Sequence, residues 1–191
     1  MNEHDLIQDA ASGDFRAFEE LIIPYEKPIY NYCLRMLCDV YEAEDVSQEV
    51  FIKVYKNLKK YQSRTDGSFK SWVYTIANNA CIDEIRKRKS RVRPESLDEV
   101  YESDGGEMSR QFESGEITPE EAVIKKERQK IITGAISKLP AEFKQMILLR
   151  ELRGMSYEEI AKITGIKIGT VKSKISRARA YLKEQIKKIY V

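Results

Sequence analysis

One segment near the end of the chain carries side chains that could read the bases of duplex DNA. A helix that begins near Gly169 has an apolar stripe that must pack inward: Val171, Ile175, Ala178 and Leu182. The opposite face presents small and cationic side chains: Lys172, Ser173, Ser176, Arg177 and Ala180. Small side chains allow a close approach to a groove, and Lys172 and Arg177 can reach the O6 and N7 atoms of guanine. Lys174 and Arg179 lie at the margins, where cations meet phosphates.

The residues before this helix predict the turn that positions it. Ser156 and Glu159 have the spacing of a capping box, which begins a short helix. Ile160 and Ile163 give that helix a buried face, and Gly165 ends it where a left-handed backbone is needed. A short helix, a turn of about four residues and a longer basic helix form the helix-turn-helix pattern.

Covalent and metal chemistry have few residues to use. The sequence contains three cysteines, Cys33, Cys38 and Cys81, and one histidine, His4. A nucleophilic cysteine and histidine pair would have to use His4, at the very start of the chain, and no glycine-rich phosphate loop is present. We therefore predict no metal site, no cofactor and no enzymatic activity.

Charge is segregated along the chain, although the formal net charge is only +2. Residues 86–93 hold six cations, residues 94–121 hold ten acids and one Arg, and residues 167–188 hold eight cations and one Glu. Two basic blocks flanking an acidic connector favour a nucleic-acid partner over ordinary solvated helix faces. No run reaches the roughly 18 apolar residues of a membrane helix, and the first residues lack the order of a signal peptide. We expect a cytoplasmic protein with no membrane insertion of its own.

Helical periodicity divides the chain into two lobes. Apolar spacings of three and four predict amphipathic helices from Phe15 to Tyr25, Ile29 to Leu37 and Ala43 to Leu58, with Pro24 and Pro28 interrupting the first pair. Further helices are predicted from Phe69 or Ser71 to Lys89 and over residues 119–138, 140–152, 156–164 and 169–189. The predicted fold is all-α: a helical domain at 1–93, a flexible acidic linker at 94–118 and a helix-turn-helix domain at 119–191.

Segments in both lobes resemble one protein family. SYEEIAKITGIKIGTVKSKISRARAYLKEQI resembles the domain-four helix-turn-helix of extracytoplasmic-function (ECF) sigma factors, the small bacterial initiation factors that direct RNA polymerase to promoters. EAEDVSQEVFIKVYKNLKKY resembles their polymerase-binding segment, and FKSWVYTIANNACIDEIRKRK resembles their promoter-melting helix. The resemblance spans nearly the whole chain except the linker, and it implies sigma domain 2 in the first lobe and sigma domain 4 in the second.

The resemblance also implies roles for individual residues. On the polymerase-binding segment, contacts to the clamp helices of the largest subunit are expected from Asp45, Gln48, Glu49 and Phe51. Contacts to the minus ten element and its upstream backbone are expected from Arg64, Asp66, Ser68, Phe69, Lys70, Trp72, Asn79, Arg86 and Arg88. Contacts to the minus thirty-five element are expected from Lys172, Ser173, Ser176 and Arg177. The implied partners are core RNA polymerase, promoter DNA and an anti-sigma factor, and the acidic linker would enter the polymerase channel.

Two other classes of protein also carry helix-turn-helix segments. A stand-alone dimeric regulator would use the first lobe as a sensor or dimerisation module and would bind a palindromic duplex site. A DNA-cutting recombinase would need an α/β catalytic domain, whereas the first ninety residues show helical periodicity only. Binding to core polymerase would distinguish a sigma factor from a stand-alone regulator and from a recombinase.

Overall fold

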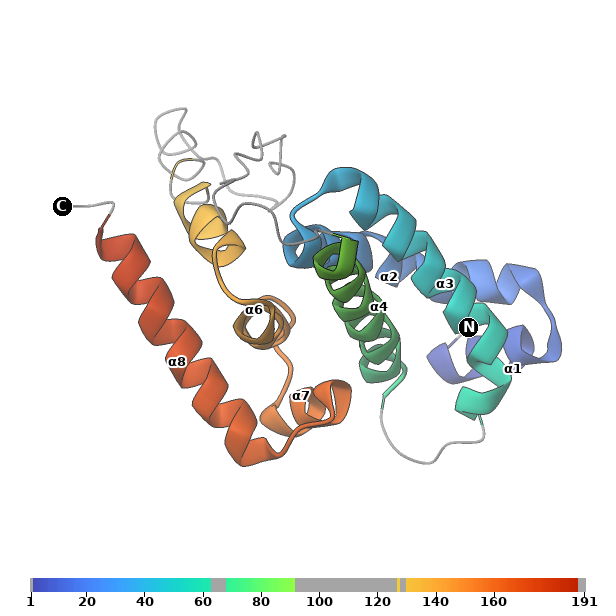
Figure 1. Cartoon of the computed structure of the whole chain (residues 1–191). Coiled ribbons are helices and arrows are strands. Elements are labelled where there is room, and N and C mark those ends of the chain that lie inside the picture. The colour runs from blue at the N-terminus through green and yellow to red at the C-terminus, as the bar shows by residue number, and fades with distance from the viewer. Residues whose placement is uncertain (1, 63–67, 92–126, 128–129, 189–191) are drawn as a thin grey trace, which may run out of the picture.

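The protein is described from a computed structural model, which covers residues 2–62, 68–91, 127 and 130–188. In the first lobe lie α1 (Glu3–Ser12), α2 (Phe15–Leu37), α3 (Val40–Gln62) and α4 (Phe69–Arg91). The second lobe has a helical segment at 130–137, then α6 (Ala141–Ile147), η1 (Leu148–Leu152), α7 (Tyr157–Thr164) and α8 (Ile168–Lys187) (Figure 1). Every regular element in these residues is helical, which confirms the all-α prediction. The predicted linker at 94–118 lies outside the described residues.

The first lobe is built around α2, α3 and α4, with α1 covering one end. Its largest fully buried side chains are aromatic or aliphatic: Tyr32, Tyr74, Phe69, Ile29, Met36 and Leu58. The buried Tyr32 hydroxyl donates to Asn78 Oδ1 at 3.0 Å, so this polar group in the core has a partner. This core holds α3 and α4 side by side, each with one face directed outward.

The prediction that Pro24 and Pro28 separate two helices is wrong, because α2 runs unbroken from Phe15 to Leu37 with both prolines inside. Each proline removes one backbone hydrogen bond, to the carbonyl four residues earlier. Those carbonyls belong to Glu20 and Pro24, which are both exposed, so water can satisfy them. Burial of the opposite face of α2 in the core stabilises the continuous helix.

The second lobe also departs from prediction at one point. Residues 140–152 were expected to form one α-helix, but α6 passes into the wider π-helical turn η1 at Leu148. Four consecutive apolar residues there are all buried: Met146, Ile147, Leu148 and Leu149. An ideal α-helix turns about 100° per residue and would direct one of four successive side chains outward. None of the helices in the described ranges is both long and apolar enough to cross a membrane.

Candidate nucleic-acid and polymerase interfaces

The turn that positions α8 is fixed by hydrogen bonds at both ends of α7. Ser156 Oγ accepts from Glu159 N at 3.1 Å, and Glu159 Oε2 accepts from Ser156 N at 2.8 Å, which confirms the predicted capping box. Gly165 ends α7 at φ 68°, a left-handed backbone that disfavours residues with a Cβ. The helix-turn-helix prediction is therefore confirmed in its local geometry.

The faces of α8 also match the prediction. Val171, Ile175 and Ala178 are buried, and Leu182 packs against the core at partial exposure. The predicted base-reading residues are all exposed: Lys172, Ser173, Ser176 and Arg177. Within the part of the chain that the structure describes, the Arg177 guanidinium has no hydrogen bond or ion pair. It is available for a ligand, whereas the Lys172 ammonium lies 5.7 Å from the centroid of the Tyr157 ring.

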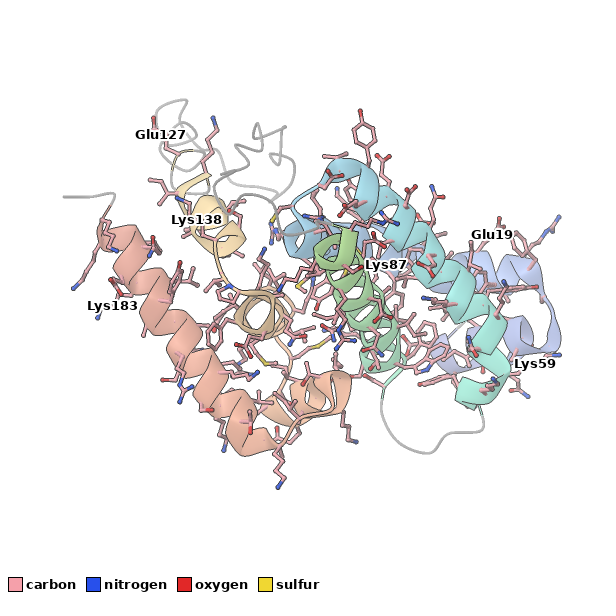
Figure 2. All side chains as sticks on the ribbon, viewed as in Figure 1. Glu19, Lys59, Lys87, Glu127, Lys138 and Lys183 are labelled. Carbon is pink, nitrogen blue, oxygen red and sulfur yellow. The ribbon has the colours of Figure 1, made fainter. Side chains whose placement is uncertain are left out.

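The two marginal cations of α8 have partners within their own lobe. Arg179 Nε and Nη2 both donate to Glu151 Oε1, at 3.0 and 2.6 Å. Lys174 pairs with Glu142 of α6. These contacts tie α8 to η1 and α6. Arg179 therefore packs locally, whereas Arg177 has no partner among the described residues. Lys183 lies further along α8, on the side away from α6 (Figure 2).

A cleft of about 380 Å³ opens between α3 and α4 in the first lobe. Its lining combines cations, amides and rings: Lys53, Asn57, Lys60, Tyr61, Trp72, Ile76 and Asn79. The Tyr61 and Trp72 rings stack with centroids 4.7 Å apart and an interplanar angle of 28°. Proteins that bind single-stranded nucleic acid stack its bases on aromatic rings and contact its backbone with cations. The cleft offers rings, amides and lysines.

The structure places the sequence-predicted minus ten residues in three different settings. Trp72 and Asn79 line the cleft. Ser68 and Lys70 are exposed at the start of α4, beside the second lobe. Phe69 is only 1% exposed and packs edge-on against Tyr61 at 5.4 Å, which corrects its expected role: the ring supports Tyr61 from the core. Arg64 and Asp66 lie outside the described residues.

The cleft residues on α3 were not predicted from the sequence. Lys60 and Tyr61 lie three and four residues after Asn57, and on α4 Ile76 lies four residues after Trp72 and three before Asn79. Trp72 and Asn79 were predicted and the α3 residues were not, because α3 was interpreted only through its polymerase-binding end. The matching periodicity at the C-terminal end of α3 was the available signal.

The basic end of α4 is only partly free for DNA. Arg86 makes an exposed pair with Asp83 at 3.4 Å, within its own helix. Arg88 reaches across to the first half of the lobe, where Nη2 donates to Leu37 O at 3.2 Å and pairs with Glu42. Exposed pairs of this kind contribute little to stability, so phosphate groups could replace the carboxylates.

The predicted polymerase-binding face lies on the outer side of α3. Asp45, Gln48 and Glu49 are exposed, and they share one helical face with Ile52, whose side chain is 53% exposed. Glu49 Oε1 lies 2.8 Å from Lys53 Nζ, and the hydrogen bond from Lys53 lowers the pKa of Glu49. Phe51 instead is half-buried against the core, so Ile52 is the apolar side chain that this face offers.

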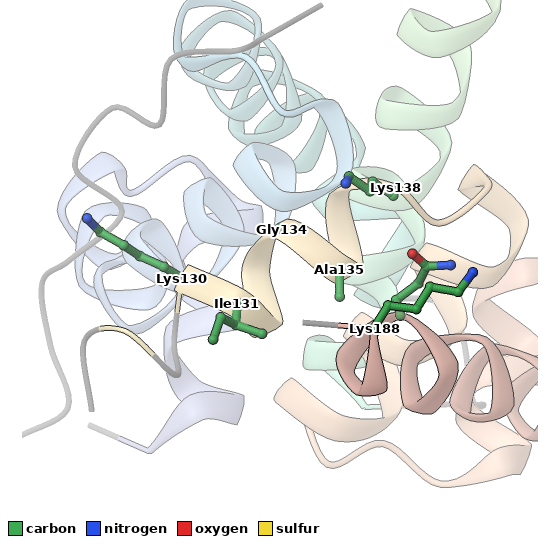
Figure 3. A pocket seen from close by; sticks show the side chains of 7 residues that line it. Lys130, Ile131, Gly134, Ala135, Lys138 and Lys188 are labelled. Atoms are coloured by element: carbon green, nitrogen blue, oxygen red, sulfur yellow. The ribbon is translucent and has the colours of Figure 1, made fainter. Parts of the chain in front are cut away.

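A second cleft, of about 450 Å³, lies in the second lobe between the 130–137 helix and the end of α8 (Figure 3). Its lining has an apolar floor and cationic edges: Lys130, Ile131, Gly134, Ala135, Lys138, Gln185 and Lys188. It lies at the opposite end of α8 from Lys172 and Arg177, so it is separate from the base-reading face.

Comparison with known proteins gives the same two units. Residues 21–91 match Sigma-70 region 2, and residues 129–182 match Sigma-70 region 4. The chain is 36% identical over 181 residues to the ECF RNA polymerase sigma factor SigW of Bacillus subtilis (strain 168), covering 95% of both chains.

Two solved structures share the fold. One is CnrH in complex with the cytosolic domain of CnrY, with TM-score 0.67, 22% identity and 97% coverage of both chains. The other is the sigma factor RpoE in complex with the anti-sigma factor NepR from Bartonella quintana, with TM-score 0.65 and 24% identity. That match covers 89% of this chain and 96% of the other. At these identities the likeness concerns the fold.

Proposed function

Because the chain belongs to the ECF family of RNA polymerase sigma factors, we propose that its lobes divide promoter recognition between duplex and single-stranded DNA. The second lobe binds the minus thirty-five element as duplex. The first lobe binds core polymerase and captures the minus ten element as a single strand. The observation that carries the proposal is the contrast between Arg177 on α8, which is exposed and has no partner in the described part of the chain, and a ring-lined cleft between α3 and α4.

The exposed face of α8 suits the major groove. Ser173 and Ser176 are small, and Gly169 has open space where a side chain would stand, so DNA can approach the start of α8 closely. Arg177 donates two hydrogen bonds to one guanine, and Lys172 adds a single point contact. At the margins of this face, Arg179 and Lys174 either keep their carboxylate partners or exchange them for phosphates of the DNA.

The cleft suits unpaired bases. A base that leaves the duplex loses stacking, which costs a few kcal/mol, and the Trp72 and Tyr61 rings offer a replacement surface. Asn79 is exposed at the cleft and presents an amide to a base edge. Lys53 and Lys60 line the same cleft and attract the phosphates. Arg86 and Arg88 hold the backbone of the duplex upstream.

The outer face of α3 suits the clamp helices of the largest polymerase subunit. Asp45, Gln48 and Glu49 provide polar contacts, and Ile52 provides an apolar one. Aliphatic side chains at the centre of a charged face are typical of protein interfaces. The acidic linker, outside the described residues, enters the polymerase channel, where ten acids between residues 94 and 121 avoid DNA.

The protein has no catalytic activity of its own and works in the cytoplasm, where polymerase and promoter are found. An anti-sigma factor regulates it; the shared fold with RpoE, solved with NepR, supports this partner. Reconstituted transcription tests the proposal. Adding the protein to active core polymerase should produce specific transcription starts on templates from its own genome. The Glu19→Lys variant, a charge reversal on the exposed α2 surface, serves as a control and should give the same starts. Absence of specific starts with active core would contradict the proposal.

A further inference from the structure

Cys38 ends α2 in a backbone conformation that suits few side chains. Its φ is 59° and its ψ is 26°, and in the described ranges it is the one residue other than glycine with a positive φ. Glycine takes this left-handed cap position at the least cost, because a Cβ crowds the backbone there. The Cys38 N–H donates to Leu34 O at 2.8 Å, which holds the residue in place. The helix therefore ends on a thiol at a position where a side chain is unfavourable.

Cys38 is also the accessible cysteine of the three. Cys33 and Cys81 are 0% exposed, whereas Cys38 is half-buried. The Cys38 thiol donates to Arg35 O at a distance of 3.7 Å, which fixes the sulfur beside the last turn of α2. Oxidation of cysteine depends on access to the sulfur. A small oxidant can therefore reach Cys38, while the other two sulfurs lie inside the core of the first lobe.

A buried amine from α6 points at this sulfur. Lys144 is only 6% exposed, and its Nζ lies 3.4 Å from Cys38 Sγ. Its other contact, to Met36 O, is 3.5 Å long, beyond the range of about 2.7 to 3.2 Å for an ordinary N–H···O hydrogen bond. Within the described ranges, Lys144 has no carboxylate partner. Because a lysine is rarely buried without a paired group, the sulfur is the contact that needs an explanation.

A structural role explains only part of this arrangement. A cation near the end of α2 interacts favourably with the helix dipole and with carbonyl groups that lack helical partners. That role needs a positive charge alone, which an arginine would supply equally well. It requires neither a primary amine nor a thiol in a left-handed cap. The combination of an accessible sulfur and a nucleophilic nitrogen 3.4 Å away points to chemistry between Cys38 and Lys144.

We propose that Cys38 and Lys144 form a peroxide-sensitive pair that closes into a covalent sulfur–nitrogen bond. Hydrogen peroxide oxidises the Cys38 thiol by two electrons to a sulfenic acid and is itself reduced, so that one water leaves. Lys144, after losing a proton to solvent, attacks Sγ as the neutral amine. The S–N bond forms, the S–O bond breaks, and the hydroxyl group leaves with an amine proton as a second water. Sulfenic acids condense with backbone nitrogen in the same way.

The observed geometry suits this condensation. The Nζ to Sγ distance of 3.4 Å is within the range of about 3 to 3.5 Å expected for atoms poised to react. The bond would tie the end of α2 to α6. Two equivalents of a small thiol reverse it: the first attacks Sγ and releases the amine, and the second reduces the resulting disulfide. The link is therefore transient in a reducing compartment, and it does not rest on the proposed function in promoter recognition.

Peptide mapping of the full-length protein tests the pair. The reduced protein is treated with a small excess of hydrogen peroxide, digested without reductant and analysed by mass spectrometry. The expected product is a pair of peptides joined through Cys38 and Lys144 that has lost two hydrogen atoms, about 2 Da, and dithiothreitol should abolish it. A 1,3-dione probe added with the peroxide traps any sulfenic acid that remains. Thermal melting shows whether each variant is folded.

Three variants assign the reaction to these side chains. Lys144→Arg keeps the cation at the end of α2 but removes the amine nucleophile. It should give no linked peptides, and the dione adduct at Cys38 should rise about tenfold, because the neighbouring amine no longer competes for the sulfenic acid. Lys138→Arg, the same change at an exposed lysine of the same lobe, is the matched control and should link as the wild type does. Cys38→Ser should give neither the link nor the adduct.

The wild-type map alone can overturn the proposal, even if Lys144→Arg fails to fold. Cys38 left unmodified by peroxide would overturn it, as would Cys38 that stops at the sulfenic or sulfinic acid without a link. A loss of two hydrogen atoms that maps only to a disulfide between Cys33 and Cys81 would also overturn it. Equal linking in a folded Lys144→Arg protein would place the bond on another nitrogen, which contradicts the pair.

Discussion

The two surfaces proposed to bind DNA differ in shape and in how they are supported. On α8 the proposed base-reading face is convex and exposed, and its side chains are separate from the buried stripe that anchors the helix. Between α3 and α4 the surface is a cleft, whose rings stack on each other and rest on the buried Phe69. A convex helix fits a groove of intact duplex, whereas a ring-lined cleft accepts bases only after they leave the duplex.

The difference in support has a consequence for mutations. A change on the exposed face of α8 should remove a proposed contact to DNA and leave the fold unchanged. A change in the cleft should remove a proposed contact and also disturb ring packing, because Trp72 touches Tyr61 and Phe69. We therefore expect substitutions in the cleft to have larger and less specific effects.

Trp72→Ala is expected to have the largest effect. Loss of stacking costs about 1 to 3 kcal/mol per base, so open-complex formation should fall by about 5- to 150-fold. Permanganate reactivity of unpaired thymines on a promoter template measures this step. Trp72→Phe keeps a ring against Tyr61 and should recover most of the loss.

All assays on Trp72 variants need to be run well below their melting temperatures, because the side chain also packs against Phe69 at 5.7 Å. Normal opening by a folded Trp72→Ala protein would show that the stacked rings serve only the core of the first lobe.

Arg177→Ala should have the next largest effect, confined to one or two base pairs of the minus thirty-five element. A lost base contact costs about 1 to 3 kcal/mol at its own position. Arg179→Ala is the matched control: its guanidinium already pairs with Glu151, so any loss should be small and equal for all sequences. Binding of holoenzyme to promoter point variants measures both. Uniform loss for Arg177→Ala would place it on the phosphate backbone.

Glu49→Lys should weaken binding to core polymerase by about tenfold, because like charges at an interface are strongly unfavourable. Stability should hardly change, since an exposed pair four residues apart, such as Glu49 with Lys53, contributes only about 0.3 to 0.5 kcal/mol. Titration of core with labelled protein measures affinity, and Glu19→Lys on α2 is the control. Unchanged affinity of a folded Glu49→Lys protein would move the interface elsewhere.

Glu159→Gln should have the smallest effect, on stability and its pH dependence. Hydrogen bonds, first from the Ser156 backbone, lower the pKa of Glu159 in the folded state. The carboxylate therefore stabilises the fold fully above its unfolded pKa of about 4.3, and this stabilisation is lost as pH falls through the lower folded pKa. Urea unfolding at pH 7 should show a loss of about 1 kcal/mol, which disappears in acid. Glu158→Gln, exposed beside it, should show neither.

The local signals of the helix-turn-helix were sufficient to predict it. The Ser156 and Glu159 capping box, the left-handed Gly165 and the faces of α8 each follow from residues close in sequence. The family match excludes the stand-alone regulator that these signals alone left open.

Features that depend on distant contacts could not be predicted. The prolines of α2 were expected to break it, because the sequence does not show that the freed carbonyls face water while the opposite side is buried. Phe69 was expected at the DNA surface. Its burial could not be predicted, because it depends on how Tyr25 and Tyr61 pack around the ring. The contacts of Lys144 Nζ with Met36 O and of Arg153 Nη2 with Pro28 O join residues more than a hundred positions apart.

In the proposed function, the two lobes read different promoter positions in different forms of DNA. The most direct test is transcription by holoenzyme from a template library with a fully randomised promoter region, followed by sequencing of the transcribed templates. Arg177→Ala should remove preference at one or two upstream positions only, whereas Trp72→Ala should leave that upstream preference intact and lower transcription from all templates, because stacking accepts any base. Loss of preference at the same positions in both variants, or uniform loss for Arg177→Ala, would contradict this division.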